Sequence, residues 1–469
     1  MSFTKIDYTP LYLKVKDVIT QRIVDGTYAP GKLIPSEADF AREFGLSIST
    51  VRQALSILVS EGALDKKQGK GTSVTNRKTP VRFLTWYPEF SEGKRIMYGL
   101  VELINANLPS IEVQIVPSTY VTLKKDLINY ISNGNCPDLI QLPTFWTSYF
   151  SSMGAFEPLD ELVSKENISA RGYETDLAGG VIDKKIYSLA MGLCPMALVC
   201  NNSLLQKAAV KIPAHPLSMR EFSLVCTQID AVLGEKQYSY GLVASKDELD
   251  FLCIYPLLTA FGGGFDVKGG KNLLDTKENI KAFTWIREFV NSHKTFRSDI
   301  FTIRKLFAKG DIAIFPDGPW IKPQMAQHSM KHFESNYTIL LNPGTSGIST
   351  SWQSNHSLAI SSQSPHKKAA AKVIEVITGN NKISEYFYGE TGVLPVNKHQ
   401  RVAAPFNTAF GKTFRKQLEH SSVLNARNPM FEKAMLLCKN AVHRILFEKA
   451  DITAELAEKE YYLKMIYYE

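Results

Sequence analysis

Apolar residues recur at helical spacing near the start of the chain and predict a first helix that ends at Asp25-Gly26. They are Leu11, Val15, Val18, Ile19 and Ile23. A second helix is predicted over residues 36–44, with Ser36 as its N-cap and acidic residues in its first turn, where the helix dipole favours them. Gly45 ends this helix.

A third helix is predicted to begin after a turn of two or three residues and to run from residue 47 to Glu61-Gly62. Its apolar positions, which should pack inward, are Val51, Leu55, Leu58 and Val59. Two short helices around a tight turn form a helix-turn-helix. Beyond it, residues 63–74 carry a basic, glycine-bearing tip and predict a two-stranded wing.

The remainder of the chain alternates between strand and helix patterns. Strands are predicted over residues 81–86, 111–116 and 138–142, and helices over residues 93–107 and 122–133. This order indicates βαβ units and a parallel sheet. We therefore expect a DNA-binding domain over residues 1–75, a short polar linker over 76–80, and a ligand domain over 81–469.

Composition and charge support this division. The chain has 469 residues, of which 44% are hydrophobic and 21% charged, as in soluble globular proteins of two or three domains. Of its net charge of +8, residues 1–78 contribute twelve Lys+Arg against eight Asp+Glu, so positive charge is densest where a nucleic-acid module needs it. No stretch predicts a signal peptide or a membrane span, and we expect a cytoplasmic protein.

The six cysteines are scattered without a CxxC pair, so reduced thiols are expected rather than a zinc site or a disulfide framework. No Gly-x-Ser-x-Gly, His-Glu-x-x-His, P-loop or paired-carboxylate motif occurs, and neither an enzyme, nor a cofactor, nor a metal is predicted. The run 262–264 is Gly-Gly-Gly without the context of a phosphate loop. Four isolated histidines are interpreted as surface residues: His215, His293, His356 and His366.

The N-terminal segment resembles the GntR family of bacterial winged-helix regulators. The matching pieces stand in order at residues 34–37 (IPSE), 47–55 (SISTVRQAL), 61–62 (EG) and 69–72 (GKGT). The resemblance implies a homodimer on a pseudo-palindromic double-stranded operator, with the third helix in the major groove. The DNA-binding residues it implies are Ser36, Ser47, Ser49, Thr50, Arg52, Gln53, Lys67, Gln68, Gly69 and Lys70.

Two departures from this family change the expected base readout. Ile48 stands where an arginine is common, and Ala38 stands where some members have a basic residue. Each bidentate arginine–guanine pair contributes about 1–3 kcal/mol of base discrimination, so recognition should shift toward DNA shape or a thymine methyl group. A winged helix that serves only for protein contacts stays open as the alternative.

The rest of the chain resembles the extracellular solute-binding proteins of ABC importers, chiefly the sugar-binding group. The resembling pieces are residues 137–140 (PDLI), 154–160 (GAFEPLD), 183–190 (DKKIYSLA), 198–202 (LVCNN), 307–314 (FAKGDIAI), 318–320 (GPW) and 392–395 (GVLP). Ala190 stands where a proline is usual, and Cys200 where a tyrosine is usual. The resemblance implies a two-lobed α/β, periplasmic-binding-protein-like (type II) domain after an α+β winged helix-turn-helix, with ligand in a hinged cleft.

Aromatic and hydrogen-bonding residues near strand ends are the candidates for ligand contact, because a sugar presents both apolar faces and hydroxyl groups. These candidates are Trp86, Glu89, Tyr120, Phe145, Trp146, Asp317, Trp320 and Trp352. Trp285 lies in a predicted helix, over residues 277–291, and is expected in the core, while Asp138 is expected to fix a strand end. The leading hypothesis is a regulator that responds to a carbohydrate or related solute. The alternative is an importer component or ligand sink without transcriptional output.

Overall fold

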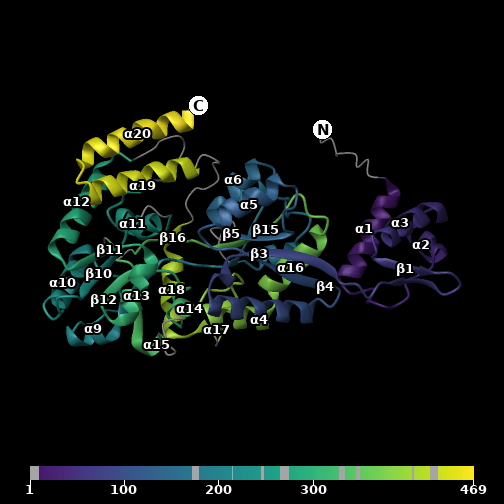
Figure 1. The fold of residues 1–469 in the computed structure, drawn as a ribbon, viewed down its shortest axis with the longest axis horizontal. Helices are drawn as coiled ribbons and strands as arrows, with labels where there is room; N and C mark the ends of the chain where they lie inside the picture. The colour runs from purple at the N-terminus through teal and green to yellow at the C-terminus, as the bar shows by residue number, and fades with distance from the viewer. Residues whose placement is uncertain are drawn as a thin grey trace.

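The computed structural model describes residues 10–171, 179–213, 215–244, 248–264, 274–326, 333–344, 349–403, 406–422 and 431–468. The first nine residues of the expected DNA-binding domain lie outside this range. The described chain forms a small N-terminal unit, here called the head, followed by two α/β lobes, each built on a five-stranded sheet. Figure 1 shows the head beside the first lobe and far from the second.

The head contains three helices and a hairpin, as the sequence predicts. They are α1 (Leu11–Val24), α2 (Glu37–Phe44), α3 (Ile48–Ser60), β1 (Leu64–Lys67) and β2 (Gly71–Val74). Phe40, Val51 and Leu55 are buried at its centre. Leu11 is 54% exposed and Val18 is 40% exposed, although both belong to the apolar pattern that predicts this helix. On the face of α1 that packs against α3, the stripe through Val15, Ile19 and Ile23 is buried.

Local chemistry explains the boundaries of these helices. Ser36 caps α2 in a capping box, since its side chain accepts a hydrogen bond from the Asp39 amide while the Asp39 carboxylate accepts one from the Ser36 amide. Gly45 ends α2 in the left-handed conformation, with φ at 62°. At the wing tip Gly69 also has a positive φ, 75°, which the three-residue hairpin loop requires.

Lobe 1 is built on a sheet with the strand order β4-β3-β5-β15-β8. β3 is parallel to β4 and β5, whereas β15 runs antiparallel to β5 and β8. The strands are β3 (Thr79–Thr85), β4 (Ile111–Pro117), β5 (Leu139–Pro143), β8 (Leu189–Gly192) and β15 (His356–Ile360), with a hairpin of β6 (Val181–Ile182) and β7 (Lys185–Ile186). The helices are η1 (Tyr87–Glu89), α4 (Ser91–Asn107), α5 (Leu123–Ser132), η2 (Thr144–Trp146), α6 (Thr147–Ser152), α7 (Lys165–Ser169), α16 (Lys367–Gly379), α17 (Asn381–Thr391) and η3 (Gln400–Val402).

Lobe 2 is built on a second sheet with the order β11-β10-β12-β9-β13. Its strands are β9 (Ala197–Asn201), β10 (Tyr238–Val243), β11 (Thr295–Ser298), β12 (Ile312–Asp317) and β13 (Tyr337–Leu340). Its helices are α9 (Asn202–Lys207), α10 (Met219–Asp230), α11 (Glu248–Ala260), α12 (Lys277–Ser292), α13 (Ile300–Lys309), α14 (Ile321–Ala326), α15 (Phe333–Asn336), α18 (Ala409–Glu419), α19 (Phe431–Phe447) and α20 (Ile452–Tyr468). Figure 1 shows α19 and α20 at the end of the molecule away from the head.

Three chain segments cross between the lobes and are hydrogen-bonded to one another. The first joins β8 to β9, the second runs from β14 (Ser351–Trp352), which pairs with β16 (Ser421–Ser422), to β15, and the third follows α17. Leu193 and Leu394 exchange backbone hydrogen bonds of 2.9 and 3.2 Å, which joins the first segment to the third. The Cys194 amide donates to Asn355 Oδ1 at 3.1 Å, which joins the first to the second. Such crossing segments are suited to act as a hinge.

The head is attached to lobe 1 by more than the linker. Val24, the last residue of α1, is buried in the lobe 1 core, and the Ser110 hydroxyl donates to its carbonyl oxygen at 3.3 Å. On α16, the Lys368 ammonium donates to the Asp17 carbonyl oxygen at 3.2 Å and lies 3.7 Å from its carboxylate. The head is therefore seated on lobe 1 at the middle and at the C-terminal end of α1.

The state of the cysteines, the length of apolar helices and the clustering of metal-ligating side chains are properties of the chain as a whole. All six cysteines are buried and free, as predicted. Within the described residues, no helix is long and apolar enough to cross a bilayer. In the same part of the chain, no group of three or more His, Cys, Asp or Glu side chains could hold a metal ion.

Candidate functional site

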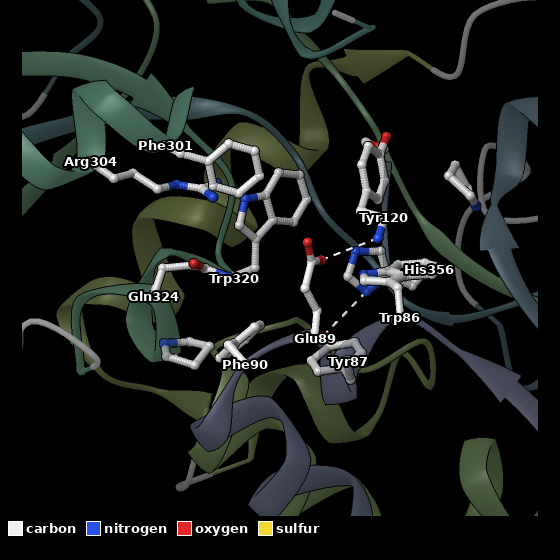
Figure 2. Close-up of a pocket in the computed structure, with 13 residues that line it drawn as sticks. Trp86, Tyr87, Glu89, Phe90, Tyr120, Phe301, Arg304, Trp320, Gln324 and His356 are labelled. Atoms are coloured by element: carbon white, nitrogen blue, oxygen red, sulfur yellow. Dashed lines mark hydrogen bonds between the residues drawn. The ribbon is translucent and has the colours of Figure 1, made fainter. Parts of the chain in front are cut away.

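A cleft with about 680 Å³ of empty space, open solvent included, lies between the two lobes. Lobe 1 and the adjoining crossing segment contribute eight of its described lining residues: Trp86, Tyr87, Glu89, Phe90, Tyr120, Pro143, Ser354 and His356. Lobe 2 contributes five: Phe301, Arg304, Trp320, Pro323 and Gln324. Figure 2 shows these side chains converging from both sides.

The lining residues stand where parallel strands end. Trp86 follows β3, Tyr120 follows β4, and Pro143 is the last residue of β5, while Trp320 follows β12 in the other lobe. In open α/β sheets the carboxyl ends of the strands form the edge at which ligands bind. Four of the predicted ligand residues, Trp86, Glu89, Tyr120 and Trp320, are brought together here.

Two glycines allow close approaches that shape the cleft. A Cβ on Gly93, in the first turn of α4, would lie 1.9 Å from the Tyr87 carbonyl oxygen, so α4 can pack beneath η1 only with glycine there. A Cβ on Gly392 would lie 2.8 Å from the Pro319 carbonyl oxygen, in the loop that carries Trp320. Gly392 also has a positive φ of 75° at the end of α17. The packing of α4 against η1 and the position of the Trp320 loop therefore both require glycine, which has no side chain.

Aromatic rings form most of the cleft wall. The Trp320 indole from lobe 2 stacks on the His356 ring from lobe 1, with centroids 5.6 Å apart and planes at 17°. Trp86 meets His356 edge-on at 4.9 Å and Tyr120 edge-on at 5.8 Å. Each offset or edge-to-face pair of rings contributes about 0.5–1.5 kcal/mol to the stability of the fold. Trp320 is thus a direct contact between the lobes.

His356 was expected at the surface, and that interpretation is wrong. Its side chain is buried at the start of β15, and its Nδ1 lies 3.3 Å from the Tyr87 hydroxyl. Burial lowers the pKa of His356 to about 3, so the imidazole is neutral at physiological pH. His293 is also no surface residue, because its ring is held between the Asp230 carboxylate and the Ser223 hydroxyl.

The carboxylate of Asp317 does not line the cleft, contrary to its place among the predicted ligand residues. Asp317 is 1% exposed and accepts two hydrogen bonds from the Arg304 guanidinium, at 2.7 and 2.8 Å. It also accepts one from the Gly318 amide at 2.8 Å. Arg304, 6% exposed, is the member of the pair that reaches the cleft. Asp317 therefore holds Arg304 in place and neutralises its charge.

Glu89 presents the one carboxylate among the described lining residues. Its side chain is exposed to the cleft, and its Oε2 accepts a hydrogen bond from the Tyr120 amide at 3.1 Å. Figure 2 shows the carboxylate projecting between Trp320 on one side and Tyr120 and Trp86 on the other. The hydrogen bond orients it without supplying a positive charge.

Three further aromatic candidates lie behind the cleft wall and do not line it. Phe145, Trp146 and Trp352 are buried in the hydrophobic core. Trp146 stacks behind Tyr120 at 6.3 Å and 24°, and Phe145 packs on Trp352 at 5.5 Å. The chain turns into η2 directly after β5, which directs both side chains of the predicted loop inward. Trp285, expected in the core, is partly buried and stacks on Phe289.

Sequence reasoning missed more than half of the cleft. Tyr87 and Phe90 flank the predicted Trp86 and Glu89, and extending the candidate strand end by a few residues would have found them. Nothing in the local pattern marks the others as cleft residues. They are Pro143, Phe301, Arg304, Pro323, Gln324, Ser354 and His356.

The predicted DNA-binding residues come from the N-cap of α2, the start of α3 and the tip of the wing. All ten are exposed except Thr50, which is partly buried. Ser47 caps α3 by accepting a hydrogen bond from the Thr50 amide at 3.1 Å, and its hydroxyl lies 2.7 Å from that of Ser49. This places a cluster of hydroxyl groups at the N-terminus of α3, where backbone amides and the helix dipole favour phosphate oxygens.

Glu37 ties the helices to the wing. Its carboxylate accepts hydrogen bonds from Arg52 Nε at 2.8 Å and from the Lys66 ammonium at 2.6 Å. The Lys66 hydrogen bond, followed by that of Arg52, holds the pKa of Glu37 below its usual value. Arg52 nevertheless stays 60% exposed, so its guanidinium is oriented at the surface of α3 and open to a further partner.

The chain matches two family descriptions. Residues 11–74 match the gntR family of bacterial regulatory proteins, and residues 90–381 match the bacterial extracellular solute-binding proteins. The first range covers the head, and the second covers the cleft-bearing lobes from the start of α4 to the start of α17.

Curated relatives divide in the same way. A protein of Brucella abortus (strain 2308) named as a binding protein is 26% identical over 321 residues, which are 67% of this chain and 74% of that protein. The uncharacterised HTH-type transcriptional regulator YurK of Bacillus subtilis is 38% identical over 129 residues, or 26% of this chain and 53% of that protein. The HTH-type transcriptional repressor NagR of Bacillus subtilis is 40% identical over 78 residues, or 17% of this chain and 32% of that protein.

Solved structures share the fold of the two lobes. The GacH receptor of Streptomyces glaucescens, solved unliganded and with acarbose, matches with a TM-score of 0.73 at 18% identity, covering 83% of this chain and 98% of that chain. A solute-binding protein of an ABC transporter from Thermotoga lettingae, bound with alpha-D-tagatose, gives the same TM-score and identity and covers 83% and 99%. The two lobes therefore have the fold of solute-binding proteins, and the head matches the gntR family.

Proposed function

The chain belongs to the bacterial extracellular solute-binding protein family and carries a GntR-family head, and from this premise we propose that it is a cytoplasmic, ligand-responsive transcription regulator. It would act as a homodimer that binds operator DNA through the winged helix and a carbohydrate or related small solute in the cleft. The working division is a DNA-binding domain over residues 1–75, a linker over 76–80 and a ligand domain over 81–469.

The observation that carries the ligand half of this proposal is the composition of the cleft. Its described lining comes from both lobes, and Trp320 already contacts His356 across it. A solute that touches both walls binds the closed arrangement of the lobes more tightly than an open one. Since a ligand shifts a conformational equilibrium only through such differential affinity, this cleft is suited to convert occupancy into lobe movement.

The DNA half is supported by the exposed hydroxyl groups at the start of α3, by Arg52, and by the basic wing. Since Val24 and Asp17 anchor the head on lobe 1, the head would follow lobe 1 when the lobes close. In a homodimer, rotation of one lobe against the other would then change the spacing of the two heads. Two half-sites on DNA tolerate only a narrow range of such spacings.

The experiment that tests the proposal is fluorescence anisotropy with DNA from upstream of the protein's own gene, with and without a panel of mono- and oligosaccharides. We expect operator binding that one of these solutes changes by tenfold or more, within the usual range of allosteric coupling of about 1–3 kcal/mol. Trp320→Ala should remove the solute response and leave DNA binding intact. Tyr98→Ala, an exposed aromatic on α4 outside the described cleft lining, is the matched control.

The results separate the proposal from its rival. DNA binding that no solute alters, in a protein that binds solutes through Trp320, would favour a ligand sink or importer component without transcriptional output. A solute response that survives Trp320→Ala would place the ligand outside this cleft. The family matches are to regulators and solute-binding proteins, not to enzymes.

A further inference from the structure

The charges that line the cleft do not balance. Among its described lining residues, the groups that can carry charge near neutral pH are Glu89, Arg304 and His356. Whether the ligand should be neutral, anionic or cationic depends on which of these charges is available to it.

The positive charge of Arg304 is already compensated. Both members of the Arg304–Asp317 pair are buried, and the two hydrogen bonds between them use Nε and one terminal nitrogen of the guanidinium. Two parallel hydrogen bonds between a guanidinium and a carboxylate fix the orientation of both groups. Moving Arg304 away would leave the buried Asp317 carboxylate without its partner. Arg304 can still donate to a hydroxyl group, but as a pair the two side chains carry no net charge.

The imidazole of His356 adds no positive charge either. It is enclosed by Trp86, Trp320 and Tyr87, at centroid separations of 4.9, 5.6 and 5.8 Å, and protonation would place an ion in a buried aromatic site. The Tyr87 hydroxyl is its one hydrogen-bonding neighbour among the described residues.

Of the three groups, Glu89 is the one whose charge is not compensated. It forms no ion pair with any described residue of the chain, and its hydrogen bond comes from the backbone of Tyr120. Around it stand the rings of Trp86, Tyr120 and Trp320, whose π faces are electron-rich. A carboxylate among aromatic faces is complementary to a cation, because both the charge and the ring quadrupoles attract it.

We propose that the cleft selects a small solute with a positively charged nitrogen, either the ammonium of an amino sugar or a quaternary ammonium group, placed between Glu89 and the Trp320 indole. This inference rests on the proposed function, because it assigns a ligand class to the same cleft. The body of the solute lies along the aromatic walls, and its hydroxyl groups meet Arg304, Gln324 and Ser354.

Matched pairs of probes that differ in charge but hardly in shape test this inference on the full chain by isothermal titration. Glucosamine is compared with glucose, and choline with 3,3-dimethyl-1-butanol. In at least one pair we expect the affinity for the charged member to be about tenfold higher than for the neutral one, or more, because the ion pair and the cation–π contact act together. The pair that shows this preference identifies an amino sugar or a quaternary ammonium solute.

Glu89→Gln keeps the shape of the side chain and removes its charge. In this variant the preference for the charged probe should fall to about twofold or less, whereas Glu112→Gln, an exposed carboxylate on β4, should keep it. Equal binding within both pairs, or no binding of any of the four probes, overturns the inference, as does a preference that survives Glu89→Gln. Neutral sugars that bind in a Trp320-dependent way without charge preference overturn the inference alone and leave the proposed function standing.

Discussion

The head and the cleft differ in how their functional residues are distributed along the chain. The ten predicted DNA-binding residues of the head fall within residues 36–70, a single stretch whose local structure places them together. The described cleft lining comes from separate segments between residues 86 and 356 and from both lobes. A site of the first kind depends on local helix and turn chemistry, while a site of the second kind depends on the packing of a whole domain.

The two regions also have separate cores. The apolar residues that stabilise the head form one cluster, and those of the lobes form two others. Val24 is the exception, because it belongs to α1 but is buried in lobe 1. Substitutions in the core of one region should therefore leave the function of the other region intact.

The largest effect should come from Phe40→Ala in the head. Phe40 is fully buried among α1, α2 and α3, and truncating a buried phenylalanine costs about 3–5 kcal/mol. Calorimetry should show loss of the head's transition and of DNA binding, with solute binding retained. Leu33→Ala, at a 66% exposed position, should change neither. Parallel loss of solute binding in Phe40→Ala would show that the two regions do not fold separately.

A comparable effect is expected in lobe 2 from Asp317→Ala. This substitution leaves the buried Arg304 guanidinium without its partner, which typically costs about 3–5 kcal/mol. Urea unfolding should show a destabilised ligand domain, while the head still binds DNA. Replacing both residues, Arg304→Met with Asp317→Leu, should recover most of the stability because no charge is then left unpaired. An unchanged unfolding midpoint in the single variant would contradict the role given to this pair.

Over any one pH unit, a smaller difference should separate the regions. The pKa of His356 is about 3 in the folded chain and about 6.5 when unfolded, so the unfolded state takes up a proton first as pH falls. The stability of the ligand domain should therefore drop between about pH 6.5 and pH 3, by at most about 1.4 kcal/mol per pH unit from this group. The head has no histidine and lacks this contribution.

His356→Gln tests the origin of that slope, since glutamine does not titrate. Unfolding of the ligand-free variant, followed between pH 5 and pH 7, should be less dependent on pH than unfolding of the parent chain. An equal dependence in both proteins would assign the acid sensitivity to other groups.

The smallest effect is expected from Arg52→Ala on the head. If Arg52 contacts a phosphate, its loss should lower the slope of log affinity against log salt concentration by about one unit. Anisotropy titrations over a range of salt concentrations measure this slope, with Arg42→Ala, an 80% exposed arginine on α2, as the control. Solute binding should not change in either variant, and an unaltered slope would remove Arg52 from the set of phosphate contacts.

Local signals in the sequence determined the elements of the head and much of lobe 1. Ser36 and Ser47 begin helices because their hydroxyl groups accept hydrogen bonds from backbone amides three residues on. Gly45 and Gly69 end a helix and turn a hairpin because glycine adopts positive φ without steric cost. These effects act over a few residues, and for that reason periodicity and turn residues were sufficient to predict them.

Only the tertiary structure decided which aromatic and charged residues face the cleft. Trp146 and Trp320 both follow a strand, β5 and β12 respectively, yet Trp146 supports Tyr120 from behind and Trp320 lines the cleft. Arg304 lines the cleft and the predicted Asp317 does not, because the carboxylate is buried and paired with the guanidinium. His356 is neutral because residues about 270 positions earlier in the chain enclose it. The burial of these side chains and their interaction partners result from contacts between distant segments, which the local pattern of the sequence does not predict.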